Sequence, residues 1–118
     1  MKDNHVYLEH IRDCILKIEL YTKNGRQAFV DDPMIQDAVM RNLEIIGEAV
    51  KNASLEFRRA HPEVGWRRAM ALRNVLIHNY MGVKAARIWT DVAKKLTALK
   101  DQVAALLAER STDDGNQM

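Results

Sequence analysis

Hydrophobic residues recur every three or four positions along most of the chain, and no stretch alternates apolar and polar residues as a strand would. Near the N-terminus this spacing predicts a helix from about Asp3 to Asn24. Its apolar stripe consists of Leu8, Ile11, Ile15 and Ile18. Asn24-Gly25 predicts the end of this helix. Residues 26–30 fit either a helix or a loop.

A second helix is predicted to begin at Pro33. Asp32 suits the N-cap position, and proline is favoured at the first helical position because its missing N–H is not needed there. The stripe continues through Val50, and we expect the helix to extend as far as Phe57. Its apolar positions are Ile35, Val39, Leu43, Ile46 and Val50.

His61-Pro62 predicts a break, because the residue before a proline avoids helical geometry. A third helix is expected to start near Trp66 and to run toward Tyr80. A fourth is expected from about Lys84 to Ala108. Its apolar face consists of Ile88, Val92, Leu96, Leu99, Val103 and Leu106.

Long amphipathic helices joined by short links predict an all-α fold, an antiparallel up-and-down bundle of four or five helices. We expect residues 1–110 to form a single helical domain. Residues 111–118 are polar and are expected to be a disordered tail.

The composition agrees with a folded helical domain and predicts a cytoplasmic protein. Hydrophobic residues make up 47% of the chain, and only five glycines and two prolines interrupt it. Cys14 is the single cysteine, so no internal disulfide can form, which fits a reducing compartment. Met1 is followed by charged residues, and no stretch of about 18 apolar residues follows. We therefore expect neither export nor contact with a membrane.

The positive charge is concentrated in one segment. Residues 58–87 contain seven Lys or Arg and one acid, Glu63, so they carry +6, whereas the other 88 residues carry −4. Such an excess in a nearly neutral protein favours an anionic partner. A solvated basic helix face would show the same excess, and charge alone does not separate the two interpretations.

Most familiar catalytic motifs are missing from the sequence: the glycine-rich phosphate loop, Cys-x-x-Cys, His-Glu-x-x-His and the nucleophile elbow. His5 and His10 do not share a helix face, so we predict no metal site and no cofactor. Glu44 and Glu48 do share a face, but such pairs are usually exposed or paired with basic neighbours. We interpret them as surface residues.

The stretch 73–80 carries the chemistry that we consider most informative. Arg73 is permanently cationic and can bind a phosphate through two parallel hydrogen bonds. His78 can take or give a proton near neutral pH. A base that takes the 2′-OH proton and a cation that stabilises the phosphate suffice for RNA cleavage without a metal.

The spacing of these residues favours a site built from two chains. Arg73 and His78 stand about 140° apart on an ideal helix, whereas Asn74 and His78 share a face, so the Asn74 amide can orient the imidazole. Two copies crossing at this helix would bring Arg and His together, and we therefore expect a homodimer. On spacing alone, an arginine in a salt bridge and a capping histidine explain the same residues.

Two separated blocks of sequence extend this picture. Residues 37–39 (Asp-Ala-Val) lead into residues 42–49 (Asn-Leu-Glu-Ile-Ile-Gly-Glu-Ala). They are followed by residues 61–64 (His-Pro-Glu-Val), by Trp66, and by the block that runs from Arg73-Asn74 to His78-x-Tyr80. Trp89 comes later in the chain. This order resembles the HepT-like family of HEPN domains across nearly the whole chain. Gly65 departs from the family pattern, which has a proline or a similar small residue before the tryptophan.

The resemblance implies a dimeric HEPN-like bundle that acts as an RNase toxin without a metal ion. It implies that Arg73 and His78 are the catalytic pair and that Asn74 is the supporting polar residue. It further implies a partner, an MntA-like nucleotidyltransferase antitoxin, which neutralises the toxin by transferring AMP from ATP to Tyr80.

Two other interpretations remain open. The chain can be a non-catalytic helical subunit that serves a nucleotidyltransferase in substrate binding or regulation, or a plain dimerisation module. The Arg/His pair and the +6 segment favour the nuclease, because an adaptor needs neither. A neighbouring nucleotidyltransferase gene would fit the nuclease and the adaptor alike, whereas toxicity of the protein expressed alone would separate them.

Overall fold

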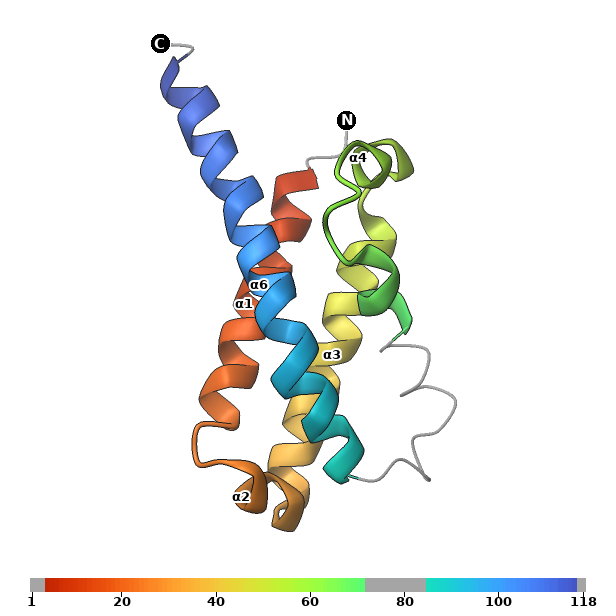
Figure 1. Ribbon diagram of the computed structural model, residues 1–118, viewed down its shortest axis with the longest axis vertical. Helices are drawn as coiled ribbons and strands as arrows, with labels where there is room; N and C mark the ends of the chain where they lie inside the picture. Colours follow the sequence, from red (N-terminus) through yellow and green to blue (C-terminus); the bar gives the residue numbers. More distant parts are fainter. Residues whose placement is uncertain (1–3, 72–84, 117–118) are drawn as a thin grey trace.

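The computed structural model describes residues 4–71 and 85–116, and every regular element in these two ranges is an α-helix (Figure 1). The predicted all-α fold class is therefore confirmed. Residues 66–71 are helical too. The other helices are α1 (Asn4–Tyr21), α2 (Arg26–Asp31), α3 (Pro33–Asn52), α4 (Leu55–Ala60) and α6 (Ala85–Asn116).

The long helices lie side by side, and α2 links α1 to α3 at one end of the molecule (Figure 1). Helix α1 packs against both α3 and α6, and each of these runs in the direction opposite to α1. The short helices α2 and α4 lie at opposite ends. This is the up-and-down arrangement that the amphipathic pattern predicted.

The core is built from the predicted apolar stripes. Leu8, Ile11, Ile15 and Ile18 of α1 are each at most 1% exposed. Facing them are the buried side chains Val39, Leu43, Ile46 and Val50 of α3 and Leu96, Leu99, Val103 and Leu106 of α6. Full burial of one such side chain stabilises a fold by about 1.5–3 kcal/mol, so these stripes dominate the packing.

Residues 26–30, which the sequence left open, form most of helix α2. Gly25 precedes it with a φ of 95°, a left-handed conformation that favours glycine. Phe29 of α2 is 1% exposed, and its ring lies 5.7 Å from the ring of Trp89 in α6. The short helix thereby closes the end of the core.

The predicted continuation of the second helix to Phe57 is wrong: α3 ends at Asn52, and a separate helix, α4, follows. The backbone N–H of Ser54 donates to Asn4 Oδ1 at 2.8 Å. The Ser54 hydroxyl in turn accepts from the Phe57 N–H at 3.1 Å, so it caps α4. A contact with the start of α1 therefore accompanies the end of α3, and the local cap at Ser54 begins α4.

Helix α6 continues to Asn116, so residues 111–116 are helical where we expected a disordered tail. Residues 109–114 contain neither proline nor glycine, and nothing in them interrupts the helical hydrogen bonds before Gly115. The C-terminal end of α6 extends past the other helices (Figure 1).

Cys14 lies in the core, 5% exposed. Burial raises the pKa of its thiol, and the neighbouring Lys17 ammonium opposes that shift. Within residues 4–71 and 85–116, no helix is long and apolar enough to cross a membrane.

The N-cap of α3 is directly testable. Asp32 accepts a hydrogen bond from the Met34 N–H at 2.9 Å, as the Asp32-Pro33 pair predicted. We expect Asp32→Ala to lower the free energy of unfolding by about 1 kcal/mol, measured by urea denaturation. Asp31→Ala, which removes only an exposed contact with Gln27, is the control and should change it by less than about 0.5 kcal/mol. Equal stability of the two variants would contradict the capping role.

Candidate functional site

The four residues predicted to carry the chemistry, Arg73, Asn74, His78 and Tyr80, lie outside the residues that the structure describes. Their roles stay predictions. The structure does describe the segment that precedes them in the chain, from α4 to residue 71, and this segment holds four of the seven basic residues of the +6 region.

The turn between α4 and the helix at residues 66–71 is held by Trp66. The indole Nε1 donates to the carbonyl of His61 at 2.9 Å, and the side chain is only 7% exposed. The ring of Phe57 lies 4.7 Å from that of His61 and 6.2 Å from that of Trp66. The first turn of the helix at residues 66–71 is therefore packed against α4.

A second anchor connects this turn to α6. The backbone N–H of Gly65 donates to Gln102 Oε1 at 3.0 Å. A Cβ added at Gly65 would meet its nearest neighbours at 3.9 Å, an ordinary contact distance, so close packing does not require glycine. A proline, by contrast, has no N–H to donate here.

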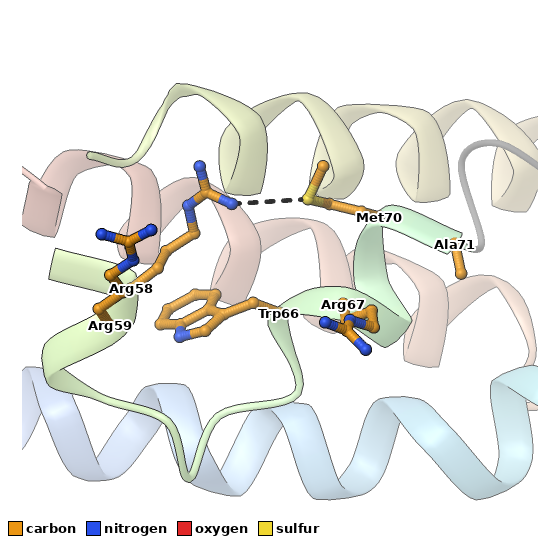
Figure 2. A pocket seen from close by; sticks show the side chains of 6 residues that line it. All are labelled: Arg58, Arg59, Trp66, Arg67, Met70 and Ala71. Atoms are coloured by element: carbon orange, nitrogen blue, oxygen red, sulfur yellow. Dashed lines mark hydrogen bonds between the residues drawn. The ribbon is translucent and has the colours of Figure 1, made fainter. Parts of the chain in front are cut away.

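Next to this anchored turn lies a cavity of about 420 Å³ (Figure 2). Its walls come from α4 and from the helix at residues 66–71. Figure 2 shows the indole of Trp66 between Arg59 and Arg67, with Arg58 extending toward Met70. The residues that line it are Arg58, Arg59, Trp66, Arg67, Met70 and Ala71.

The three cavity arginines have no carboxylate partner among the described residues, unlike other basic residues of the chain. Arg12, Arg41 and Lys100 form ion pairs with Asp13, Glu44 and Glu19 at 3.1, 3.3 and 3.0 Å. Glu63, the one acid of the +6 segment, lies 3.4 Å from His61 instead.

Arg58 is held in a polar contact that leaves part of its guanidinium group unsatisfied. Its Nη1 donates to the Sδ of Met70 at 3.7 Å, and sulfur is a weak acceptor. Its Nε is buried and has no hydrogen-bond partner in the described part of the chain. A phosphate oxygen would be a stronger acceptor than this sulfur for the Nη1 end of the group.

Sequence reasoning counted Arg58, Arg59 and Arg67 toward the basic segment but did not recognise them as a cluster. The available signal was weak: two adjacent arginines near a helix end and a third directly after Trp66. Their convergence depends on the angle between α4 and the next helix, which the spacing of residues along the chain does not show.

Glu44, His5 and His10, for which the sequence predicted no catalytic role, each have a described neighbour. Glu44 is paired with Arg41, and the rings of His5 and His10 contact Phe57 and Tyr7. In residues 4–71 and 85–116, no three His, Cys, Asp or Glu side chains are grouped as metal ligands would be.

Comparison with known proteins gives one family. The family model described as "Ribonuclease HepT-like" matches residues 11–106, a range that includes both the cavity and the Arg73 to Tyr80 block. No solved structure gives a significant match.

Several curated proteins are similar over most of this chain. A Caldanaerobacter subterraneus subsp. tengcongensis protein named as an RNase is 43% identical over 91% of this chain and 96% of its own length. A Thermococcus cleftensis protein named as a probable ribonuclease HepT is 42% identical, over 90% of this chain and 98% of its own. A Methanocaldococcus jannaschii protein, named as both a gamma-glutamylcyclotransferase and an RNase, is 37% identical over 98% of this chain. The chain spans about half, 53%, of that longer relative.

The anchor at Gly65 generates a prediction about stability. Gln102→Met keeps the size of the side chain but removes the acceptor, so the Gly65 N–H loses its partner. We expect the free energy of unfolding to fall by about 1–3 kcal/mol, measured by urea denaturation. Gln102→Glu retains an acceptor oxygen and should recover most of that loss. A Met variant as stable as the Glu variant would show that this hydrogen bond does not hold the turn.

Proposed function

The chain belongs to the HepT-like ribonuclease family, and from this membership we propose that it is a metal-independent RNA endonuclease, the toxin of a cytoplasmic toxin–antitoxin pair. The observation that carries the proposal is the family match over residues 11–106, which contains Arg73 and His78. The arginine-lined cavity supports an anionic substrate, because its cations are not neutralised by described carboxylates.

In the proposed reaction, His78 takes the proton of a ribose 2′-OH, and the 2′-oxygen attacks the adjacent phosphorus. Arg73 stabilises the negative charge that develops on the phosphoryl oxygens. The bond to the 5′-oxygen of the next nucleotide breaks, and that oxygen receives a proton from the protonated imidazole of His78, which restores the free base. The products are a 2′,3′-cyclic phosphate and a 5′-hydroxyl, so no water and no metal enter this step.

We propose that the working enzyme is a homodimer. Arg73 and His78 point about 140° apart on an ideal helix, and a second copy supplies the missing member of each pair. Asn74 lies one turn before His78 and would hold its imidazole in the reactive orientation.

The catalytic assignment predicts the behaviour of two variants. Arg73→Ala and His78→Ala should each reduce cleavage of single-stranded RNA by at least about 100-fold and relieve growth inhibition. Wild-type cleavage should persist in EDTA, since the proton transfer and the charge stabilisation both come from side chains. Gel analysis of end-labelled RNA measures both effects.

The controls are Arg26→Ala and His10→Ala, which change an exposed arginine and an exposed histidine elsewhere in the chain. Both should cleave like wild type. Full activity of either catalytic variant, or loss of cleavage in EDTA that Mg²⁺ restores, would contradict the mechanism. Wild-type protein that binds a nucleotidyltransferase but cuts no RNA would favour the adaptor interpretation.

We further propose that an MntA-like nucleotidyltransferase silences the toxin by attaching AMP to Tyr80. The phenol oxygen of Tyr80 would attack the α-phosphorus of ATP, release pyrophosphate and lose its proton. Tyr80 follows His78 by two residues, so the added group would occupy space near the cleavage site. Its phosphate can pair with Arg73 and remove the cation that the RNA needs.

Tyr80→Phe tests this control point. The variant keeps the ring but lacks the acceptor oxygen, so it should stay active and toxic in the presence of the antitoxin. Intact mass after incubation with antitoxin and ATP should rise by whole adenylyl groups in wild type and should not change in the variant. Tyr7→Phe is the matched control and should be modified like wild type. Silencing of Tyr80→Phe would exclude Tyr80 as the switch.

A further inference from the structure

The cavity beside Trp66 combines two surfaces that recognise different parts of a nucleotide. Three guanidinium groups, from Arg58, Arg59 and Arg67, provide positive charge, and Trp66, Met70 and Ala71 provide an apolar wall. Its volume of about 420 Å³ falls within the range of about 300–1,000 Å³ that is typical of small-ligand sites.

Two of the three cations are exposed to a ligand, and the third is only weakly engaged. Arg59 and Arg67 are exposed and have no ion-pair partner among the described residues. Arg58 has an unsatisfied buried Nε and otherwise donates to sulfur. Guanidinium groups bind phosphate oxygens through pairs of parallel hydrogen bonds, which gives both charge and geometry.

The positions of the arginines fit a strand better than a single phosphate ion. Figure 2 shows Arg59 and Arg67 on opposite sides of Trp66. A base seated against Met70 and the small exposed part of Trp66 would therefore have a cation near each of the two phosphates that flank it. Bases in single-stranded RNA can turn outward and pack against aromatic and arginine side chains, whereas bases in a duplex cannot.

We propose that this cavity binds one nucleotide of single-stranded RNA, with its base against Trp66 and Met70 and its flanking phosphates on Arg58, Arg59 and Arg67. The inference rests on the proposed function, since it names a substrate subsite of the same enzyme. It assigns a role to residues outside the Arg73 to Tyr80 block. An acidic protein surface is the competing ligand, but it would not need the apolar recess.

The test measures binding with a probe that the enzyme cannot cut. A fluorescein-labelled single-stranded RNA with 2′-O-methyl groups lacks the attacking hydroxyl, and fluorescence anisotropy reports its Kd with the full-length protein. Arg59→Gln/Arg67→Gln should raise the Kd about tenfold or more and lower the slope of log Kd against log salt by about 1 to 2.

The matched control removes the same charge from the other end of the molecule. Lys23→Gln/Arg26→Gln changes two exposed residues next to and within α2, which lies at the end opposite to α4 (Figure 1). This pair should change the Kd by less than about threefold, because it alters only the long-range field. A circular dichroism melt confirms that both double variants are folded.

A second pair of variants tests the cavity without removing an arginine. Ala71→Glu places a carboxylate at the exposed position of the cavity wall, and it should weaken probe binding because it repels phosphate and neutralises a nearby cation. Ala104→Glu, at an exposed position of α6, is its control and should bind the probe like wild type.

The outcomes separate this inference from the proposed function. Wild type that binds the probe through the cavity but does not cut unmodified RNA would leave the inference standing and overturn the nuclease. A different result would overturn the inference alone: wild type cuts RNA, and the cavity variant Arg59→Gln/Arg67→Gln binds and cuts RNA as well as the control variant Lys23→Gln/Arg26→Gln. If Arg59→Gln/Arg67→Gln loses antitoxin binding but binds RNA like wild type, the cavity is a protein-docking surface and the inference is overturned. Failure of wild type to bind the probe would overturn the inference too.

Discussion

Burial of the apolar stripe of α1 is the interaction on which the rest of the structure depends. Ile11, Ile15 and Ile18 are fully inaccessible, and α1 packs against both α3 and α6. In proteins most of the stability of a helix comes from the packing of its apolar face, so α1 depends on these contacts. The same packing places Asn4, at the start of α1, beside Ser54, so it also decides where α3 ends.

Polar contacts then position the arginine-lined cavity on this frame. The Gly65–Gln102 and Trp66–His61 hydrogen bonds hold the turn before residue 66 against α6 and α4. These bonds are few and partly buried, so the loss of any one leaves a polar group without a partner. The cavity walls come from two short helical segments, and their relative position depends on this turn.

The arginine cluster has an energetic consequence for a small enzyme. Arg58, Arg59 and Arg67 line one cavity with no described carboxylate among them, so they repel one another when the cavity is empty. An anionic ligand would relieve that repulsion, and part of its binding free energy would come from this relief. Like charges that repel one another in the free protein would thus favour association with a polyanion, and we would expect the salt dependence typical of nucleic-acid binding.

The sequence by itself determined the helical class, the stripes of the core, the cap at Asp32-Pro33 and the family resemblance. All of these depend on residues close together along the chain, where the 3.6-residue period and local capping rules apply. Only the tertiary structure decided that α3 stops at Asn52, because the Ser54 N–H bonds to Asn4, fifty residues away. It also brought the cavity arginines together around Trp66, since side chains on two helices meet at an angle that packing imposes and no local spacing encodes.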